Sequence, residues 1–178
     1  INFYQNIEVL KKLMELKNYV LKHIKETEQK IACELIETVK EFRPAVVGFK
    51  LWETFGIHGS AAIAGEVKKY FPKIITVGGG PHVAEFQDYI LDFTDNFDFL
   101  VHGEGEISLL EIMKYSEGKS KVKNIPNLIY RDGGEIKKTP VEFVKNPGEL
   151  PCPVYNEEIY PAMAGDRKIK AFLLEASR

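Results

Sequence analysis

Three short apolar runs, separated by helical stretches, constrain the fold of this chain more than any other feature. The runs lie at residues 45–49, 74–77 and 97–101. Continuous apolar runs of this length are typical of strands that a parallel sheet buries on both faces. Each run is followed by a stretch with the apolar spacing of a helix, at residues 61–71, 85–93 and 106–116. The alternation predicts right-handed βαβ units, and therefore an α/β fold with a doubly wound, mostly parallel sheet.

The first 43 residues have a different pattern, which is typical of amphipathic helices. Two apolar stripes run along this segment, at Leu13, Leu16, Val20 and Ile24 and then at Ile31, Leu35, Val39 and Phe42. We expect both stripes to be core or packing faces. The polar stretch at residues 25–30, between the stripes, predicts a kink or a short connection. Cys33 is expected to be buried on the second helical stretch.

The pattern changes again after Gly118. Residues 127–131 and 135–139 flank Asp132-Gly133-Gly134, which predicts a β-hairpin, because Asp-Gly supplies the positive φ of a tight turn. The proline-rich residues 147–161 are typical of a linker, and residues 170–175 look like a new strand. The predicted division is a helical segment over 1–43, an α/β domain over 44–120, a hairpin extension over 121–150, and a linker with a first new strand over 151–178.

Charge and cysteine content argue against several classes of function. A formal net charge of -2 gives no support to a general electrostatic role with nucleic acid or membranes. No apolar run approaches the ~20 residues that span a bilayer, and no signal peptide opens the chain, so we expect a cytoplasmic protein. The two cysteines, Cys33 and Cys152, lack the spacing of a zinc or redox motif and are expected to be reduced thiols.

Glycine-rich or polar segments follow the three predicted strands, where ligands bind in sheets of this kind. The first segment is a long loop over residues 50–60, and the third opens a predicted helix, at whose amino end carboxylates are favoured. The second contains three successive glycines, which let the backbone approach a ligand closely. The candidate ligand-binding residues are Phe49, Lys50, Leu51 and Trp52; Gly78, Gly79, Gly80, Pro81 and His82; and His102, Gly103, Glu104, Gly105 and Glu106.

Each of these segments also has a simpler interpretation. The first is then a surface loop, the second a tight strand-to-helix turn, and the third a helix cap. The third segment lacks the last glycine of a dinucleotide fingerprint and carries negative charge, so we reject a dinucleotide site. Neither a phosphate-binding loop nor a nucleophile elbow occurs in the sequence. The residues alone therefore predict an α/β binding module with a glycine-lined ligand face.

Four segments, in order, resemble the N-terminal region of B12-binding radical S-adenosylmethionine enzymes. They are Val46–Phe49, Val67–Pro72, Val77–His82 and Phe97–Glu106. The hairpin and residues 150–155 also fit, and the chain ends at Ser177-Arg178, where the three-cysteine cluster motif of that family would begin. The resemblance implies a flavodoxin-like or Rossmann-like sheet, a cobalamin cofactor, and a radical S-adenosylmethionine domain that begins within residues 151–178.

The resemblance also implies roles for individual residues. Gly79 and Gly80 match the double glycine along which the nucleotide tail of cobalamin lies. Lys50 stands where the family more often has the serine of a Ser-x-Leu element, and residues 102–106 form the neighbouring wall. The Asp-x-His-x-x-Gly motif, whose histidine replaces the lower cobalt ligand, is absent. The usual first strand of the domain is not found before residue 44.

The sequence therefore predicts the cobalamin-binding part of a B12-dependent radical S-adenosylmethionine enzyme, methyltransferase-like or related, that is not catalytic by itself. The resemblance implies a 4Fe-4S cluster and S-adenosylmethionine only in the longer parent protein, because this chain lacks the cysteine triplet. The expected partners are cobalamin and the radical S-adenosylmethionine domain of the same chain, without nucleic acid or membrane. Two alternatives stay open: a flavodoxin-like packing or substrate-recognition module without a cofactor, and an unrelated small-molecule enzyme.

Overall fold

The computed structural model describes residues 3–52 and 54–151 of the chain. The chain divides into two compact units, residues 1–143 and 144–178. The elements of the first unit are α1 (Phe3–Phe42), β1 (Val46–Lys50), α2 (Thr54–Tyr70), β2 (Ile75–Gly79), α3 (Pro81–Phe86), α4 (Tyr89–Phe93), β3 (Phe99–Val101), α5 (Glu106–Ser116), the 3-10 turn η1 (Val122–Asn124), β4 (Leu128–Asp132) and β5 (Glu135–Lys138). The second unit has a 3-10 turn, η2 (Pro147–Glu149). The strand expected at residues 170–175 and most of the expected linker lie outside the described residues.

Five strands form one mixed sheet in the order β1-β2-β3-β4-β5. β1, β2 and β3 are parallel, and β4 and β5 are antiparallel to their neighbours. The predicted α/β fold class is confirmed, with the three apolar runs as its parallel part. The predicted hairpin is also confirmed, and it continues the same sheet because β4 pairs with β3. The strands follow chain order, so the carboxyl ends of β1–β3 share one edge without a reversal of strand order.

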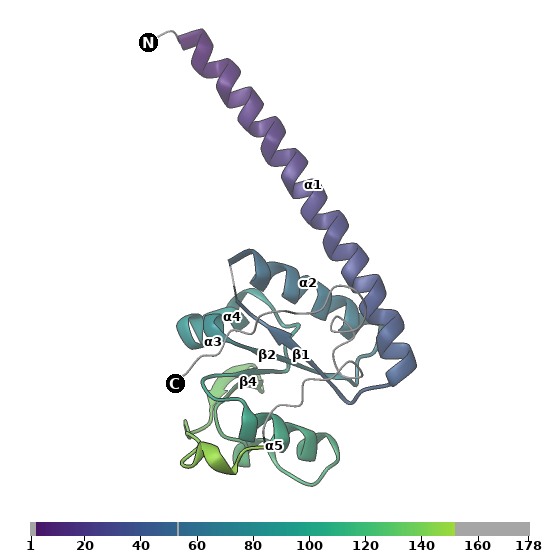
Figure 1. Cartoon of the computed structure of the whole chain (residues 1–178), viewed down its shortest axis with the longest axis vertical. Coiled ribbons are helices and arrows are strands. Elements are labelled where there is room, and N and C mark those ends of the chain that lie inside the picture. Colours follow the sequence, from purple (N-terminus) through teal and green to yellow (C-terminus); the bar gives the residue numbers. More distant parts are fainter. Residues whose placement is uncertain (1–2, 53, 152–178) are drawn as a thin grey trace. The chain divides into compact units, whose positions relative to one another are not determined.

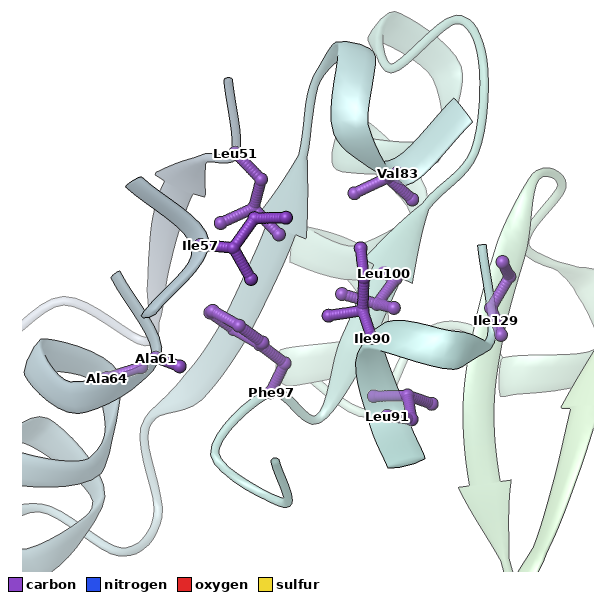
Figure 2. Close-up of a cluster of buried hydrophobic side chains, with 10 residues drawn as sticks. All are labelled: Leu51, Ile57, Ala61, Ala64, Val83, Ile90, Leu91, Phe97, Leu100 and Ile129. Carbon is purple, nitrogen blue, oxygen red and sulfur yellow. The ribbon is translucent and has the colours of Figure 1, made fainter. Parts of the chain in front are cut away.

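Helices cover both faces of the sheet, with α2 on one side and α5 on the other in Figure 1. Successive residues of a strand point to opposite faces, so Leu100 packs toward α2–α4 and Val101 toward α5. Figure 2 shows the buried side chains on the α2 face of the sheet, which come from α2, α3, α4, β3, β4 and the loops that hold Leu51 and Phe97. Burial on both faces explains why the parallel strands read as continuous apolar runs rather than as alternating ones.

α1 is one continuous helix of 40 residues, so the predicted kink at residues 25–30 is wrong. That stretch is made mainly of lysine, glutamate and glutamine, which favour helix, and it contains neither glycine nor proline. Only the C-terminal part of α1 packs on the domain, where Ile36 and Val39 meet Val67 of α2. The prediction that the first apolar stripe is a packing face is not met within the described chain, because its members are exposed or half-buried. Cys33, expected to be buried, is exposed.

Two helix boundaries differ from the sequence-based expectation. The expected long loop at residues 50–60 is short, because α2 already begins at Thr54. Ile57, Ala61 and Ala64 continue the helical spacing toward the core, which outweighs the weak helix preference of the glycines nearby. The single helix expected over residues 85–93 is two short helices, α3 and α4, separated by Gln87 with a φ of 47°. The helix expected at residues 106–116 is confirmed as α5.

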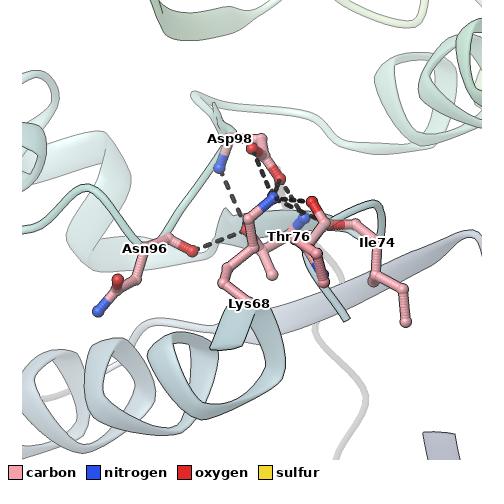
Figure 3. Close-up of polar contacts among 6 residues, drawn as sticks. Lys68, Ile74, Thr76, Asn96 and Asp98 are labelled. Carbon is pink, nitrogen blue, oxygen red and sulfur yellow. Dashed lines mark hydrogen bonds and ion pairs between the residues drawn. The ribbon is translucent and has the colours of Figure 1, made fainter. Parts of the chain in front are cut away.

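A polar cluster fixes the amino ends of β2 and β3 to the end of α2 (Figure 3). Lys68 Nζ donates to both carboxylate oxygens of Asp98, at 2.9 and 2.8 Å, and to the carbonyl of Ile74 at 3.1 Å. The backbone N–H of Thr76 donates to Asp98 at 2.8 Å, and the Thr76 hydroxyl donates to the carbonyl of Asn96 at 2.7 Å. The cluster lies at the sheet edge opposite the glycine turn, so it supports the fold rather than the candidate site.

Candidate functional site

The three candidate segments lie at one edge of the sheet, because the strands that precede them are parallel neighbours. The strand register places Lys50 opposite Gly79, and Gly79 opposite Val101. The loop after β1, the glycine turn after β2 and the loop after β3 therefore start side by side. Ligands of open α/β sheets bind beyond this edge, at the carboxyl ends of the strands.

The loop after β1 is bonded to the glycine turn through Leu51. The Leu51 N–H donates to the Gly79 carbonyl at 2.7 Å, and the Leu51 carbonyl accepts from the His82 N–H at 3.2 Å. Leu51 is fully buried, whereas Trp52 is 54% exposed. The ammonium group of Lys50 lies 4.2 Å from the centroid of the Trp52 ring, a cation–π contact. The outer surface of this loop is therefore an aromatic ring and a cation.

Phe49 lies on the other side of the sheet from Lys50. Its ring packs edge-on against Phe97, with 5.7 Å between the ring centroids, at the boundary of the core under α2. Of the four candidate residues in the first segment, the structure therefore buries Leu51 fully and Phe49 in part. Lys50 and Trp52 are at the surface.

The three successive glycines of the turn have three different surroundings. A Cβ on Gly78 would lie 2.7 Å from Leu100 Cδ2, so the core fills the space above this residue. A Cβ on Gly79 would have its nearest neighbour, Val101 Cβ, at 4.0 Å, so a side chain fits there without a clash. Gly80 has a φ of 113°, and a Cβ there would lie 3.0 Å from the Leu51 carbonyl oxygen. Gly78 thus serves packing, Gly80 serves the turn, and Gly79 leaves bare backbone at the surface.

Gly48 extends this bare backbone onto β1. It pairs with Val77, two residues before the Lys50–Gly79 pair, so Gly48 and Gly79 lie on the same face of the sheet. Gly48 is exposed, and a Cβ there would meet nothing within 4 Å. We call Gly48 and Gly79 the bare strip. The sequence analysis did not select Gly48, although a glycine inside a strand often marks a place where a ligand or another backbone approaches.

The loop after β3 is organised by Asn127, which the sequence analysis also missed. Asn127 is buried with a φ of 60°, and its carbonyl accepts a hydrogen bond from the His102 N–H at 2.8 Å. Its side-chain amide donates to the carbonyl of Glu104 at 2.9 Å and to that of Glu142 at 3.0 Å. The only signal in the sequence is an asparagine between a proline and an apolar run, which favours a turn. Gly103, with a φ of 89°, has open space around it.

His82 has an unusual environment at the start of α3. Its Nδ1 atom is buried and has no hydrogen-bond partner within the described part of the chain. Its ring packs against that of Phe86, with 5.4 Å between the centroids. A buried polar atom without a partner is costly, so it usually signals a missing contact with water or a ligand. Pro81, just before it, is exposed and begins the helix.

The candidate site is an open surface rather than a closed cavity. Lys50, Trp52, Gly80, Pro81 and Gly103 are all exposed. Three hollows of about 600 Å³ each lie elsewhere: between α1 and α2, at the amino ends of β2 and β3, and beside the end of α1. Within residues 3–52 and 54–151, no three His, Cys, Asp or Glu side chains come together as metal ligands. Nor does any helix in those ranges have the length and apolarity needed to cross a membrane.

Comparisons with known proteins give one family model and several relatives. The family model of the B12 binding domain matches residues 5–113. An uncharacterized methyltransferase of Pyrococcus horikoshii is 26% identical over 124 residues, which is 69% of this chain and 27% of that protein. This chain therefore spans about a quarter of the length of that relative.

Two solved structures share the fold. One is the radical S-adenosylmethionine methyltransferase TsrM from Kitasatospora setae, with tryptophan and a S-adenosylmethionine analogue bound. It superposes with a TM-score of 0.54 and 21% identity, over 61% of this chain and 21% of TsrM. The other is the cobalamin-dependent radical enzyme OxsB, with aqua-cobalamin and S-adenosylmethionine bound, at a TM-score of 0.54 and 16% identity, over 64% of this chain and 16% of OxsB.

Proposed function

The chain belongs to the B12 binding domain family, and we propose that it binds cobalamin at the carboxyl edge of β1, β2 and β3. The observation that carries this proposal is the bare strip formed by Gly48 and Gly79. There the backbone of two neighbouring strands is open to an approaching molecule, whereas Val77, Gly78 and Leu100 beside it are buried. A flat or extended ligand can lie against such a strip without displacing any side chain.

The residues around the strip fit a large cofactor with both polar and apolar parts. Trp52 and Lys50 form one wall, and the loop from His102 to Gly105 forms the other. Gly80 holds the turn that keeps Leu51 and His82 in place, and the unpartnered Nδ1 of His82 can gain a hydrogen bond when a ligand arrives. When bound, cobalamin supplies cobalt chemistry, either carrying a methyl group or assisting electron transfer. This chain's own residues bind and orient the cofactor.

We further propose that the chain is one part of a larger radical S-adenosylmethionine enzyme, methyltransferase-like or related. The relatives support this, because the chain covers 27% of the Pyrococcus protein, 21% of TsrM and 16% of OxsB. The chain has two cysteines, so the three cysteines of a cluster motif must come from elsewhere in such an enzyme. On this proposal, the iron–sulfur cluster and S-adenosylmethionine bind to a separate domain, and this domain presents cobalamin to it. The open candidate site is consistent with a second domain closing over it.

A spectroscopic titration tests the cobalamin proposal. Hydroxocobalamin is added to the protein, unbound cofactor is removed by desalting, and the visible spectrum of the retained cofactor is recorded. We expect retention by the unaltered chain and loss of retention in Gly79→Trp, whose side chain fills the space above the bare strip. The matched control is Lys73→Trp, at the opposite end of β2, where Lys73 is exposed. It is expected to retain cobalamin.

Equal retention by Gly79→Trp and Lys73→Trp would place the site elsewhere. If the unaltered chain does not retain cobalamin, the titration is repeated with the anaerobically prepared protein in its full natural length. Failure there as well would refute cobalamin binding and favour a cofactor-free packing module. The cation–π contact between Lys50 and Trp52, which closes the first loop on itself, is the observation that favours this alternative.

A further inference from the structure

An apolar stripe runs along nearly the whole length of α1 and is exposed to solvent. Its members are spaced three, four or seven residues apart, which places them on one side of the helix. They are Val9, Leu13, Leu16, Val20, Ile24, Ile31, Leu35 and Phe42. Leu13 is 55% exposed, Leu16 58% and Phe42 72%, while Ile24 and Leu35 are half-buried. We call this set the α1 stripe.

The α1 stripe lies beside the face that holds α1 on the domain, and only Leu35 among its described members packs against the cluster at that face. That face is made of Ala32, Ile36 and Val39, which are buried near α2. The domain therefore packs only on the C-terminal part of the helix, and mainly through residues outside the α1 stripe. The N-terminal part of α1 has no buried side chain between residues 7 and 31, so no tertiary packing stabilises it there. Helices without tertiary packing are marginal in water, so a surface partner is needed.

The two halves of α1 carry opposite net charges. The N-terminal half, residues 3–22, carries four lysines and two glutamates, a net charge of +2. The C-terminal half, residues 23–42, carries three lysines and five glutamates, a net charge of −2. This order opposes the helix dipole, which favours acidic residues near the start and basic residues near the end. The charges therefore do not stabilise α1 as an isolated helix.

The same charges match a second copy of the helix that runs in the opposite direction. In an antiparallel pair, the positive half of each helix lies against the negative half of the other. In a parallel pair, like-charged halves would lie together. An antiparallel pair also has the two-fold symmetry of most homodimers, in which the same surface is used by both subunits. We propose that two copies of this chain associate through antiparallel α1 helices, with the α1 stripe as the buried seam.

The oligomeric state and its dependence on the α1 stripe test the proposal. Sedimentation velocity is measured on the protein in its full natural length, over a range of micromolar concentrations. The variant Leu13→Glu/Val20→Glu places two charges in the seam and is expected to weaken the dimer by roughly 100-fold or more. The control Asn18→Glu/Gln29→Glu adds the same two charges away from the stripe and is expected to change the dimer little. Circular dichroism checks that the domain stays folded in both variants.

A single spin label per chain tests the direction of the helices. Cys33 and Cys152 are replaced by serine, and exposed Lys12 is replaced by a labelled cysteine. If the halves align by charge, residue 12 of one copy lies beside residue 33 of the other, so the two labels are roughly 30 Å apart at 1.5 Å per residue. A parallel pair would bring them to roughly 10–20 Å.

Three results would overturn the proposal. The first is a monomer at all concentrations, and the second is a dimer that both double variants weaken equally. The third is the short distance between labels. Any of these results would mean that another segment of the natural protein or a different partner covers the α1 stripe.

Discussion

The difference between Gly78 and Gly79 gives a sharp prediction, because two adjacent residues of one strand should respond in opposite ways to the same substitution. In Gly78→Ala, the new methyl group would lie 2.7 Å from Leu100 Cδ2 and 3.0 Å from Leu51 Cδ1, and both leucines are fully buried. Overpacking of this kind costs about 1–3 kcal/mol. Alanine also reduces the backbone freedom of the unfolded chain, which stabilises the folded state by about 0.4–1 kcal/mol. We expect a net loss of about 1–2 kcal/mol.

In Gly79→Ala, the new methyl group meets nothing closer than 4.0 Å, so only the gain from the unfolded chain remains. We expect stability that is unchanged or raised by up to about 1 kcal/mol. Urea and thermal denaturation followed by far-ultraviolet circular dichroism measure both variants. The first should melt several degrees lower than the unaltered chain, since 1 kcal/mol corresponds to roughly 3–5 °C for a unit of this size.

A third variant tests the cause of the loss. Shortening Leu100 to valine in the Gly78→Ala background relieves the contact, so the double variant should lose less than the sum of the two single losses. The reasoning is refuted if Gly78→Ala is as stable as the unaltered chain, or if Gly79→Ala loses as much. A double variant whose losses simply add would also refute it.

Three further predictions concern the polar contacts around the sheet. Asp98→Ala should lower the free energy of unfolding by about 2–4 kcal/mol, because it removes the acceptor of several hydrogen bonds and leaves a half-buried lysine without its partner; a loss under about 0.5 kcal/mol in urea denaturation would contradict this. Asn127→Ala should lower the free energy of unfolding by about 2–3 kcal/mol, because it removes three hydrogen bonds and places alanine at positive φ. It should also speed amide hydrogen exchange at the loop after β3. Unchanged exchange at the amides of residues 102–105 would show that Asn127 does not organise this loop. The hydrogen bond from Lys138 lowers the pKa of Asp88. The resulting contribution to stability is present above the usual aspartate pKa near 4 and is lost as pH falls through the lower pKa of the folded state. Both side chains are partly exposed, so Asp88→Asn should remove well under 1 kcal/mol of this acid dependence in thermal melts between pH 2 and 6, and an unchanged pH profile would contradict the prediction.

Much of the fold could be predicted from the sequence, because its strongest signals are local. The three apolar runs became β1, β2 and β3, and residues 106–116 became α5. The hairpin followed from Asp132-Gly133-Gly134, whose two glycines have φ values of 63° and 89°. These elements depend on side-chain periodicity and turn chemistry within a few residues. The sequence also placed the candidate segments at one edge, since the carboxyl ends of parallel strands meet there.

The remaining features depend on contacts between distant segments. Gly56 and Gly59 made the start of α2 look like a loop, and only packing of Ile57 against the core turns it into helix. The exposure of Cys33 depends on which side of α1 meets α2. The bare strip exists because the register of β1 and β2 sets Gly48 beside Gly79 on one face, and no local pattern reports a register between strands.

The order of the strands has a consequence for how the chain acquires its structure. Each strand pairs with the one that precedes it in the chain, and no pairing among the described strands joins residues more than 31 positions apart, as Phe99 and Tyr130 are. Each strand can therefore pair with a strand that was synthesised before it. Sheets with such short-range pairing form quickly, because little loop-closure entropy has to be overcome. A nascent chain can add β2, β3 and the hairpin to β1 one after another as it leaves the ribosome, without waiting for its end.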